Sequence, residues 1–252
     1  YKGKYLFELS GRYDGTSRFA AGHRFGFFPS ASLGWRISEE PWFTPVKDVM
    51  NNLKLRASFG SLGNQKVKNN AWMRTISFDN FKEFTFDGSA MGRYATISAP
   101  NASDLTWETS TQYNVGVDAG FFNDKLMFTA EGFIRDTKGM LQKGVDLPGI
   151  YGADSPLMNS ADLRTSGYEL SISWRDQFDL GGKPFGYSLM ANLSDNKTII
   201  TKYDNKDRIF AKKYYVGMEL GEIWGFVTDG LFATDEEAQA YAKEMDLSYI
   251  TK

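Results

Sequence analysis

The sequence contains no cysteine and a single histidine, His23, among its 252 residues. The lack of cysteine excludes disulfides, thiolate metal sites and cysteine nucleophiles, and one histidine excludes a cluster of histidine metal ligands. The net charge is −2, so the chain lacks the basic excess with which proteins hold nucleic acid through phosphate contacts. We therefore expect no thiol chemistry, no histidine-based metal centre and no nucleic-acid partner.

Long apolar runs are also missing. No stretch of about 18 apolar residues occurs, which excludes a transmembrane helix. A transmembrane β-barrel gives the same result, because its strands alternate polar and apolar residues. The chain opens YKGKYLFELS, without the Met, cationic region or apolar segment of a signal peptide. We expect an internal piece of a longer protein.

Aromatic residues and glycine are abundant. Aromatics make up 15% of the chain, and 25 residues are Gly. This composition favours β structure, where flat rings pack on pleated faces and Gly permits turns and bulges. Phe28 and Phe133 are large apolar exceptions on otherwise polar faces. Period-two alternation predicts strands over residues 5–13, 25–37, 53–60, 103–119, 125–136, 165–175 and 185–195.

These strands have features of a barrel that crosses a membrane. Most run to about ten residues, the length that crosses a bilayer at a tilt. Their apolar faces carry rings near both ends, as interfacial girdles do. The ring pairs are Phe25 with Trp35, Trp107 with Tyr113, and Tyr168 with Trp174. The last four connections alternate short turns with long loops, as outer-membrane barrels do, whereas the first two do not.

The tail differs from the rest of the chain. The strand pattern weakens after the seventh strand, and strand parity starts the tail on the outer side. We therefore predict an extracellular insert over residues 197–252. Thr234 and Glu237 fit a capping box, which predicts a helix near residues 234–245.

Five segments of the sequence, in order, resemble the SusC/RagA-type TonB-dependent outer-membrane transporters. They are SGRYDGTSRFAAGHRFGFFPSASLGWRISEEPWF, LKLRASFGSLGNQ, DLTWETSTQYNVGVDAGFFNDKLMFTAEGFIRDTKGML, NSADLRTSGYELSISW and GEIWGFVTDGLF. One such segment is a weak signal, but five in order over nearly the whole chain are strong. The chain is similar to an internal fragment of a barrel of this family.

The resemblance implies an all-β fold that is part of a large antiparallel transmembrane β-barrel. We expect an open curved sheet of about seven or eight strands, with long outer loops and a short helix in the tail, because so few strands cannot close such a barrel. The resemblance also implies the outer membrane of a Gram-negative bacterium, a SusD-like surface lipoprotein, and energy from the TonB complex. The plug and the TonB-contacting box of the family are not visible here, so contact with TonB would be made through an N-terminal part.

The leading functional hypothesis is import of glycan or peptide fragments, by a barrel that contacts outer-membrane lipid, needs no cofactor and is not an enzyme. One alternative is a passive structural or ligand-binding barrel, which the plug and TonB box of the parent would distinguish. Another is a soluble β-sandwich binding module, whose folded state would not depend on detergent.

Aromatic residues of the predicted outer loops are candidate contacts for the ligand or the lipoprotein. Rings suit sugars, which present apolar C–H faces, and they also grip peptides. The candidates are Trp72, Phe84, Phe86, Tyr94 and Tyr151. Packing within the loops would explain the same residues.

Charged residues alternate with the apolar ones along the strands and are predicted to face inward. They include both signs, so in a plugged barrel they would bond the plug or line water, with substrate contact as the alternative. They are Glu8, Arg12, Arg36, Arg56, Glu108, Glu131, Arg135, Glu169 and Arg175.

Two polar groups resemble reactive or metal sites. The first shares one loop, but nothing fixes the geometry of a hydrolytic triad, and DGTS suits a turn. The second is spaced like calcium ligands, but no Gly-centred loop or closing Glu follows. The groups are Asp14, Ser17 and His23, and Asp204, Asn205 and Asp207. We predict no catalytic residue and no metal site.

Overall fold

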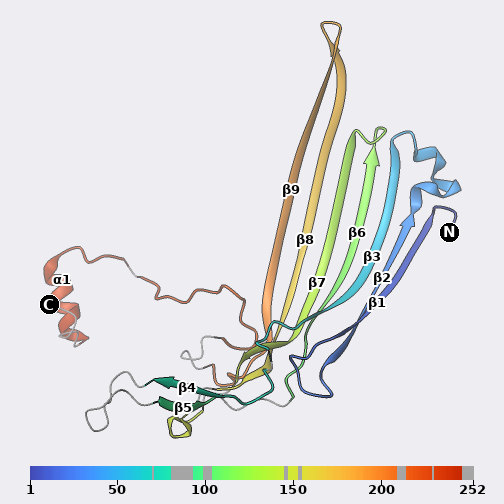
Figure 1. Cartoon of the computed structure of the whole chain (residues 1–252). Coiled ribbons are helices and arrows are strands. Elements are labelled where there is room, and N and C mark those ends of the chain that lie inside the picture. The colour runs from blue at the N-terminus through green and yellow to red at the C-terminus, as the bar shows by residue number, and fades with distance from the viewer. Residues whose placement is uncertain are drawn as a thin grey trace, which may run out of the picture. The chain divides into compact units, whose positions relative to one another are not determined.

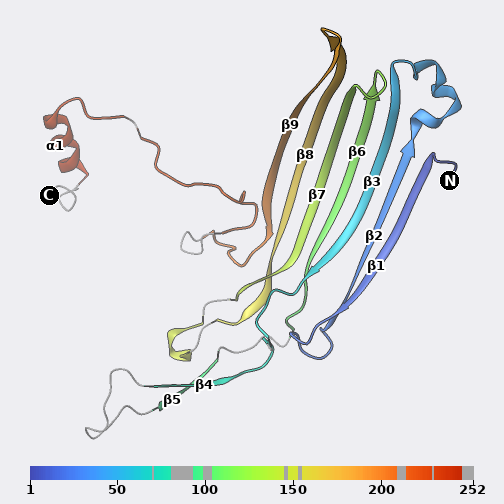
Figure 2. The ribbon, with the colours of Figure 1, turned by 45° about the horizontal axis from the view of Figure 1, so that its top comes forward.

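One antiparallel sheet with strand order β1-β2-β3-β6-β7-β8-β9 dominates the structure (Figures 1 and 2). It curves as an open wall, with β1 and β9 at its two edges. The computed structural model describes residues 1–69, 71–80, 93–98, 104–144, 147–152, 155–208, 214–228 and 230–245. The strands of the sheet are β1 Tyr5–Gly15, β2 Phe25–Arg36, β3 Met50–Asn64, β6 Glu108–Phe121, β7 Leu126–Lys143, β8 Leu157–Leu180 and β9 Lys183–Lys202.

The remaining elements are short. β4 (Ile76–Asn80) and β5 (Arg93–Ile97) form a separate two-stranded sheet. Three 3-10 helices are η1 Ile37–Glu39, η2 Pro41–Val46 and η3 Gly149–Tyr151, and the α-helix is α1 Asp235–Glu244. In the part of the chain that the structure describes, no helix is long and apolar enough to cross a membrane.

The register of the sheet gathers the apolar residues on one face, as predicted. One row across all strands joins Tyr5, Trp35, Leu55, Val117, Ala130, Leu170 and Leu193. The next row, on the opposite face, joins Leu6, Gly34, Arg56, Gly116, Glu131, Glu169 and Ser194. We call these the apolar face and the polar face. On the apolar face, Phe7, Leu9 and Val115 are each about 70% exposed, and a contiguous exposed apolar surface of this kind marks contact with a partner or a membrane.

The rings of the apolar face form two belts that run diagonally across the strands. The belt nearer the turn end runs from Tyr5 on β1 and Trp35 on β2 to Trp174 on β8. The belt nearer the long connections contains Tyr13 on β1, eight residues from the Tyr5 row, and Tyr168 on β8, two residues from that row. The belt therefore shifts by six residues over five strand-to-strand steps. At about 3.3 Å per residue and 4.8 Å between strands, this slope equals a strand tilt of about 40°. That tilt is the one with which transmembrane barrel strands cross a bilayer.

Trp107 does not belong to these belts, and its predicted place on the apolar face is wrong. β6 begins only at Glu108. The Trp107 side chain is 7% exposed and packs edge-to-face on Phe28 and Phe19, at 5.4 and 5.7 Å between ring centroids. Its Nε1 donates to the carbonyl oxygen of Arg24 at 3.3 Å. The indole therefore joins a cluster of connections instead of facing outward.

The two out-of-pattern phenylalanines each cover a glycine of a neighbouring strand. A Cβ on Gly167 would lie 2.8 Å from the Phe133 ring, and one on Gly63 would lie 2.0 Å from the Phe28 ring. Pairing of β2 with β3 ends at Ser30, so Phe28 lies where these strands have separated. Both rings thus fill space that a missing side chain leaves beside them.

Several strands extend beyond their predicted ends. The segment 176–184 was expected to be a loop, but β8 and β9 pair through it, and only Gly181 and Gly182 remain as the turn, at φ 62° and 77°. The rings of Phe178 and Phe185 pack at 5.3 Å across this hairpin, which accounts for the continued pairing. β9 also runs to Lys202, so the predicted insert over 197–252 begins with strand residues.

Residues Gly221–Lys252 form a second compact unit, distinct from Tyr1–Leu220. Within it, the predicted helix is present as α1. The Thr234 hydroxyl accepts from the backbone N–H of Glu237 at 3.3 Å, and the Glu237 carboxylate accepts from the backbone N–H of Ala233 at 2.9 Å. The capping interactions therefore fix the start of this helix.

The sheet has two unlike ends. At the loop end, drawn lowest in Figure 1, lie the connection 16–24 and the points where the sheet strands meet the connections 65–107 and 144–156. At the turn end lie the connection 37–49 and the turns after β6 and β8. Glu40 stands at the turn end and accepts hydrogen bonds from Tyr5 at 2.7 Å, Trp35 at 3.2 Å and Lys4 at 3.1 Å. It clamps the first two strands to the connection that follows them.

The hydrogen bond from Tyr5, then those from Trp35 and Lys4, hold the pKa of the Glu40 carboxyl below its ordinary value of 4.5. A lowered folded-state pKa means that the clamp stabilises fully above about pH 4.5 and is lost as pH falls through the lowered value. In urea titrations of the full-length barrel, we expect the wild type to lose stability more steeply than Glu40→Gln below pH 4.5. Parallel declines of the two proteins would contradict the clamp.

Candidate functional surfaces

The loop end is organised by one small buried cluster. Phe19, Phe28, Leu105 and Trp107 form its centre, and Val67, Ala71 and Leu141 pack around it. These residues come from two connections, 16–24 and 65–107, and from the strands β2 and β7. Their burial offsets the entropy of ordering the connections. The cluster therefore fixes the connection 16–24 and both ends of the connection 65–107 to the sheet.

Hydrogen bonds extend this order along the rim. Trp72 donates from Nε1 to the carbonyl oxygen of Ser17 at 3.3 Å, and the Arg24 guanidinium lies 6.0 Å from the centre of the Trp72 ring. Arg18 donates to the carbonyl oxygen of Gln65 at 3.0 Å. Asn159 binds both backbone groups of Thr106, at 2.9 and 3.0 Å. The rim offers a shaped surface of rings and cations.

The five aromatic candidates fall at different places. Trp72 belongs to the rim just described. Tyr94 lies in β5 opposite Asp79, and Tyr151 is the last residue of η3. Phe84 and Phe86 lie outside the described residues. Contact of these rings with a ligand or a lipoprotein stays a prediction.

The polar face carries hydrogen-bonded networks that cross strands. Arg56 on β3 reaches over Gly116 on β6 and pairs with Asp118 at 3.3 Å and with Glu131 on β7. A Cβ on Gly116 would lie 2.9 Å from the Arg56 guanidinium carbon, so glycine leaves the passage open. The alternation predicted these charges on one face but did not indicate which of them pair.

A second network on the same face lies nearer the loop end. Arg135 donates from Nε to Gln112 at 2.9 Å, Gln112 donates to Asn114 at 2.7 Å, and Asn114 donates to Ser58 at 2.9 Å. We call these four residues the amide ladder. It lines a hollow of about 610 Å³ together with Glu8, Arg12 and several serines.

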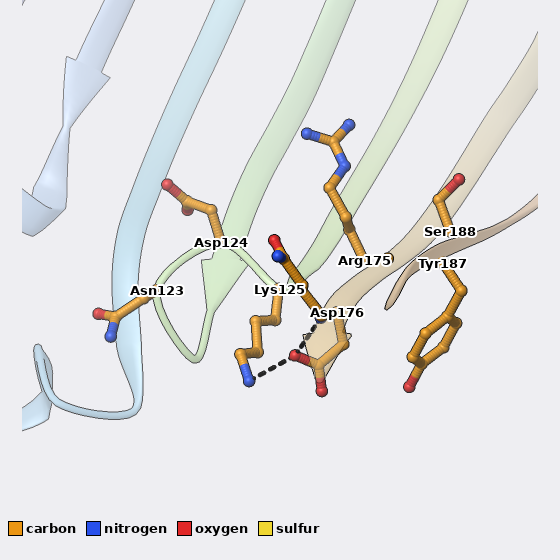
Figure 3. A pocket seen from close by; sticks show the side chains of 9 residues that line it. Asn123, Asp124, Lys125, Arg175, Asp176, Tyr187 and Ser188 are labelled. Atoms are coloured by element: carbon orange, nitrogen blue, oxygen red, sulfur yellow. Dashed lines mark hydrogen bonds and ion pairs between the residues drawn. The ribbon is translucent and has the colours of Figure 1, made fainter. Parts of the chain in front are cut away.

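A second hollow, of about 620 Å³, lies at the turn end between the β6–β7 turn and the β8–β9 hairpin (Figure 3). Lys125 pairs with Asp176 across it at 2.7 Å. Arg175 points away from that pair. The turn itself is tight, because Phe122, Asn123 and Asp124 all have positive φ, at 55°, 57° and 61°. This ion pair fixes the two turns to each other.

The two polar groups singled out in the sequence have structural partners. The Asp14 carboxylate accepts from Arg12 at 2.9 Å, and the described part of the chain shows no hydrogen bond joining the side chains of Asp14, Ser17 and His23. Asn205 is 5% exposed and donates to the carbonyl oxygen of Tyr214 at 2.8 Å. Among the described residues, no three acidic or histidine side chains lie close enough to share a metal ion.

Comparison with known proteins decides the family. Residues 1–232 match the family described as TonB dependent receptor-like, beta-barrel. The chain belongs to this family. The open sheet is therefore a segment of a receptor barrel, and the predicted resemblance is confirmed.

Named relatives lead to the same family. The receptor segment is 29% identical to the TonB-dependent receptor P39 of Formosa agariphila over 94% of its own length and 22% of the relative. It is 33% identical to the TonB-dependent receptor SusC of Bacteroides thetaiotaomicron, over 84% of the segment and 20% of SusC. The segment thus spans about a fifth of these relatives.

Solved structures show the same arrangement of strands. The RagAB peptide importer in its closed-closed and open-open states superposes with a TM-score of 0.67 and 28% sequence identity. The superposition covers 81% of the segment and 21% of the importer chain.

Proposed function

We propose that the receptor segment is part of the wall of an outer-membrane importer that takes up glycan or peptide fragments in a Gram-negative bacterium. The superposition on the RagAB peptide importer, at 28% identity over 81% of the segment, carries this proposal. The exposed apolar face, with ring belts inclined as in transmembrane barrels, supports it independently. Acyl chains would cover the apolar face, and the polar face would line the interior.

The loop end is proposed to face the outside of the cell and the turn end the periplasm. Outer-membrane barrels place short turns on the periplasmic side and long loops outside. The ordered rim at the loop end would then seat a SusD-like lipoprotein, and the TonB complex would act from the turn end through a part of the protein beyond these residues.

Cysteine labelling tests this orientation. Residues 1–252 contribute no native cysteine, so Lys68→Cys at the loop end and Asp179→Cys at the β8–β9 turn can be introduced separately into the full-length receptor. An impermeant maleimide on intact cells is expected to label position 68 only, and position 179 only after the outer membrane is permeabilised. The reverse pattern would invert the topology, and labelling of both positions on intact cells would exclude a membrane wall.

Uptake measurements test the import itself. Deletion of the full receptor gene is expected to abolish uptake of a fluorescent pool of either oligosaccharides or short peptides. Dissipation of the inner-membrane proton gradient should give the same loss, because TonB-coupled import needs that energy. A passive barrel would instead remain open after the gradient is dissipated.

A further inference from the structure

The amide ladder holds the Arg135 guanidinium in a fixed orientation. Its Nε donates to Gln112 at 2.9 Å, and its central carbon lies 5.9 Å from the centre of the Phe133 ring. Phe133 is itself held over Gly167, where a Cβ would come within 2.8 Å of the ring. Both contacts leave the two terminal nitrogens of Arg135 unused, in the fork that binds a carboxylate bidentately.

Hydrogen-bond polarity along the ladder favours an anion. Gln112 uses its carbonyl oxygen to accept from Arg135, and Asn114 uses its own to accept from Gln112. Each amide nitrogen keeps one N–H beyond the one it spends in the ladder. The strip that lines the hollow therefore presents donors from three neighbouring side chains, and its amide acceptors are already occupied.

On the polar face of the described sheet, no carboxylate lies beside this fork. Glu8 lines the same hollow, but it stands on β1, four strand-to-strand steps from Arg135 on β7, which is about 19 Å along the sheet. On the polar face of β6, β7 and β8, the nearest carboxylates are Glu108, Glu131 and Glu169, each four positions along its strand from the ladder level. That separation is about 13 Å, which exceeds the screening length of about 8 Å at physiological ionic strength. Glu131 is also engaged by Arg56.

The ladder lies near the mouth of the proposed barrel. Gln112 and Arg135 pair in the row next to Tyr113 and Ile134, where Tyr113 belongs to the ring belt nearer the loop end. A solute that enters from the loop end would reach this level first.

We propose that Arg135, positioned by Gln112 and Phe133, is a carboxylate-binding subsite for the imported solute. The proposal rests on the import function above and narrows it to fragments that carry a carboxylate. Peptide C-termini and the uronate groups of glycans share this chemistry. Serine hydroxyl groups line much of the rest of the hollow, beside Glu8, Arg12 and the apolar Phe28 and Leu62. The hydroxyl groups suit the polar remainder of either ligand.

The test uses the purified full-length receptor and two matched pairs of probes. One pair is a pool of short peptides with free C-terminal carboxylates and the same pool amidated. The other is a pool of uronate-bearing oligosaccharides and neutral ones of equal length. Mass spectrometry of the retained ligands is expected to show about tenfold enrichment of the carboxylate forms in one pair, the value of one charge-assisted hydrogen bond. The enriched pair identifies the source of the carboxylate.

Three variants separate recognition from folding. Arg135→Gln is expected to remove the enrichment while the receptor still retains neutral probes. Arg135→Lys should keep part of it, since charge remains but the fork is lost. Arg175→Gln, on the polar face at the turn end, should leave it intact.

Each other outcome has a defined meaning. Retention without a carboxylate preference, or a preference that survives Arg135→Gln, would overturn the subsite alone. Arg135→Gln could instead fail to fold while Arg135→Lys and Gln112→Leu keep the full preference. That result would show that Arg135 pairs with an acid of the protein itself, and it would also overturn the subsite. A wild-type receptor that retains no probe would overturn both the subsite and the import function.

Discussion

Leu170→Arg is expected to destabilise the receptor barrel by about 2–4 kcal/mol, whereas Ser171→Arg should cost less than about 1 kcal/mol. Leu170 lies on the apolar face of β8, between the rings of Tyr168 and Trp174. An arginine there would place its charge among acyl chains near the middle of the bilayer. Ser171 is the next residue and lies on the polar face beside Thr129, where a long cation reaches water.

The two variants form a matched pair, because they place the same side chain one residue apart on one strand. Unfolding by denaturant after reconstitution of the full-length receptor into lipid vesicles gives both free energies. Equal costs for the two substitutions would show that the assignment of faces is wrong. A larger cost for Ser171→Arg would reverse it.

The sequence predicted the facing of the strands because period-two alternation is a local property. Leu170 and Ser171 can be assigned to opposite faces without knowledge of any other strand. The belt residues Tyr113, Tyr168 and Trp174 follow from the same rule. Register between strands is not local, so the diagonal course of the belts emerged only from the structure.

Interactions between distant segments escaped the sequence analysis. Trp107 fits the alternation of its strand, yet Phe19 and Phe28, about eighty residues earlier, draw it into the loop-end cluster. The β4–β5 hairpin lies in an insert whose strands are only five residues long each, too short for a periodic signal. The predicted strands 165–175 and 185–195 end before the turn of the β8–β9 hairpin, because the polar residues between them resemble a loop.

The candidate polar residues were predicted as a set but not as networks. Arg56 and Arg135 carry the same charge and alternate in the same way along their strands. One lies opposite a glycine and between two acids, and the other lies beside two amides. Cross-strand neighbours decide this difference, and a single strand does not contain them.

Arg56→Met is expected to destabilise the barrel by about 2–3 kcal/mol, because it leaves two carboxylates without their cation. Arg56 pairs with Asp118 and Glu131, and the three side chains are 33%, 22% and 20% exposed. Water screens a half-buried cluster of this kind in part, which keeps the cost below that of a fully buried pair. Denaturant unfolding of the full-length receptor in detergent measures the loss.

Rescue experiments separate charge from packing at this cluster. If the lost free energy reflects the unpaired carboxylates, Asp118→Asn with Glu131→Gln should restore most of the stability of Arg56→Met, since neutral amides need no counter-charge. Gly116→Ala keeps all three charges but places a Cβ 2.9 Å from the Arg56 guanidinium carbon, and it should cost about 1 kcal/mol by displacing that group. A triple variant no more stable than Arg56→Met would mean that the unpaired carboxylates do not cause the loss. The packing of the Arg56 guanidinium over Gly116 would then provide the stability, and the ion pairs would be incidental.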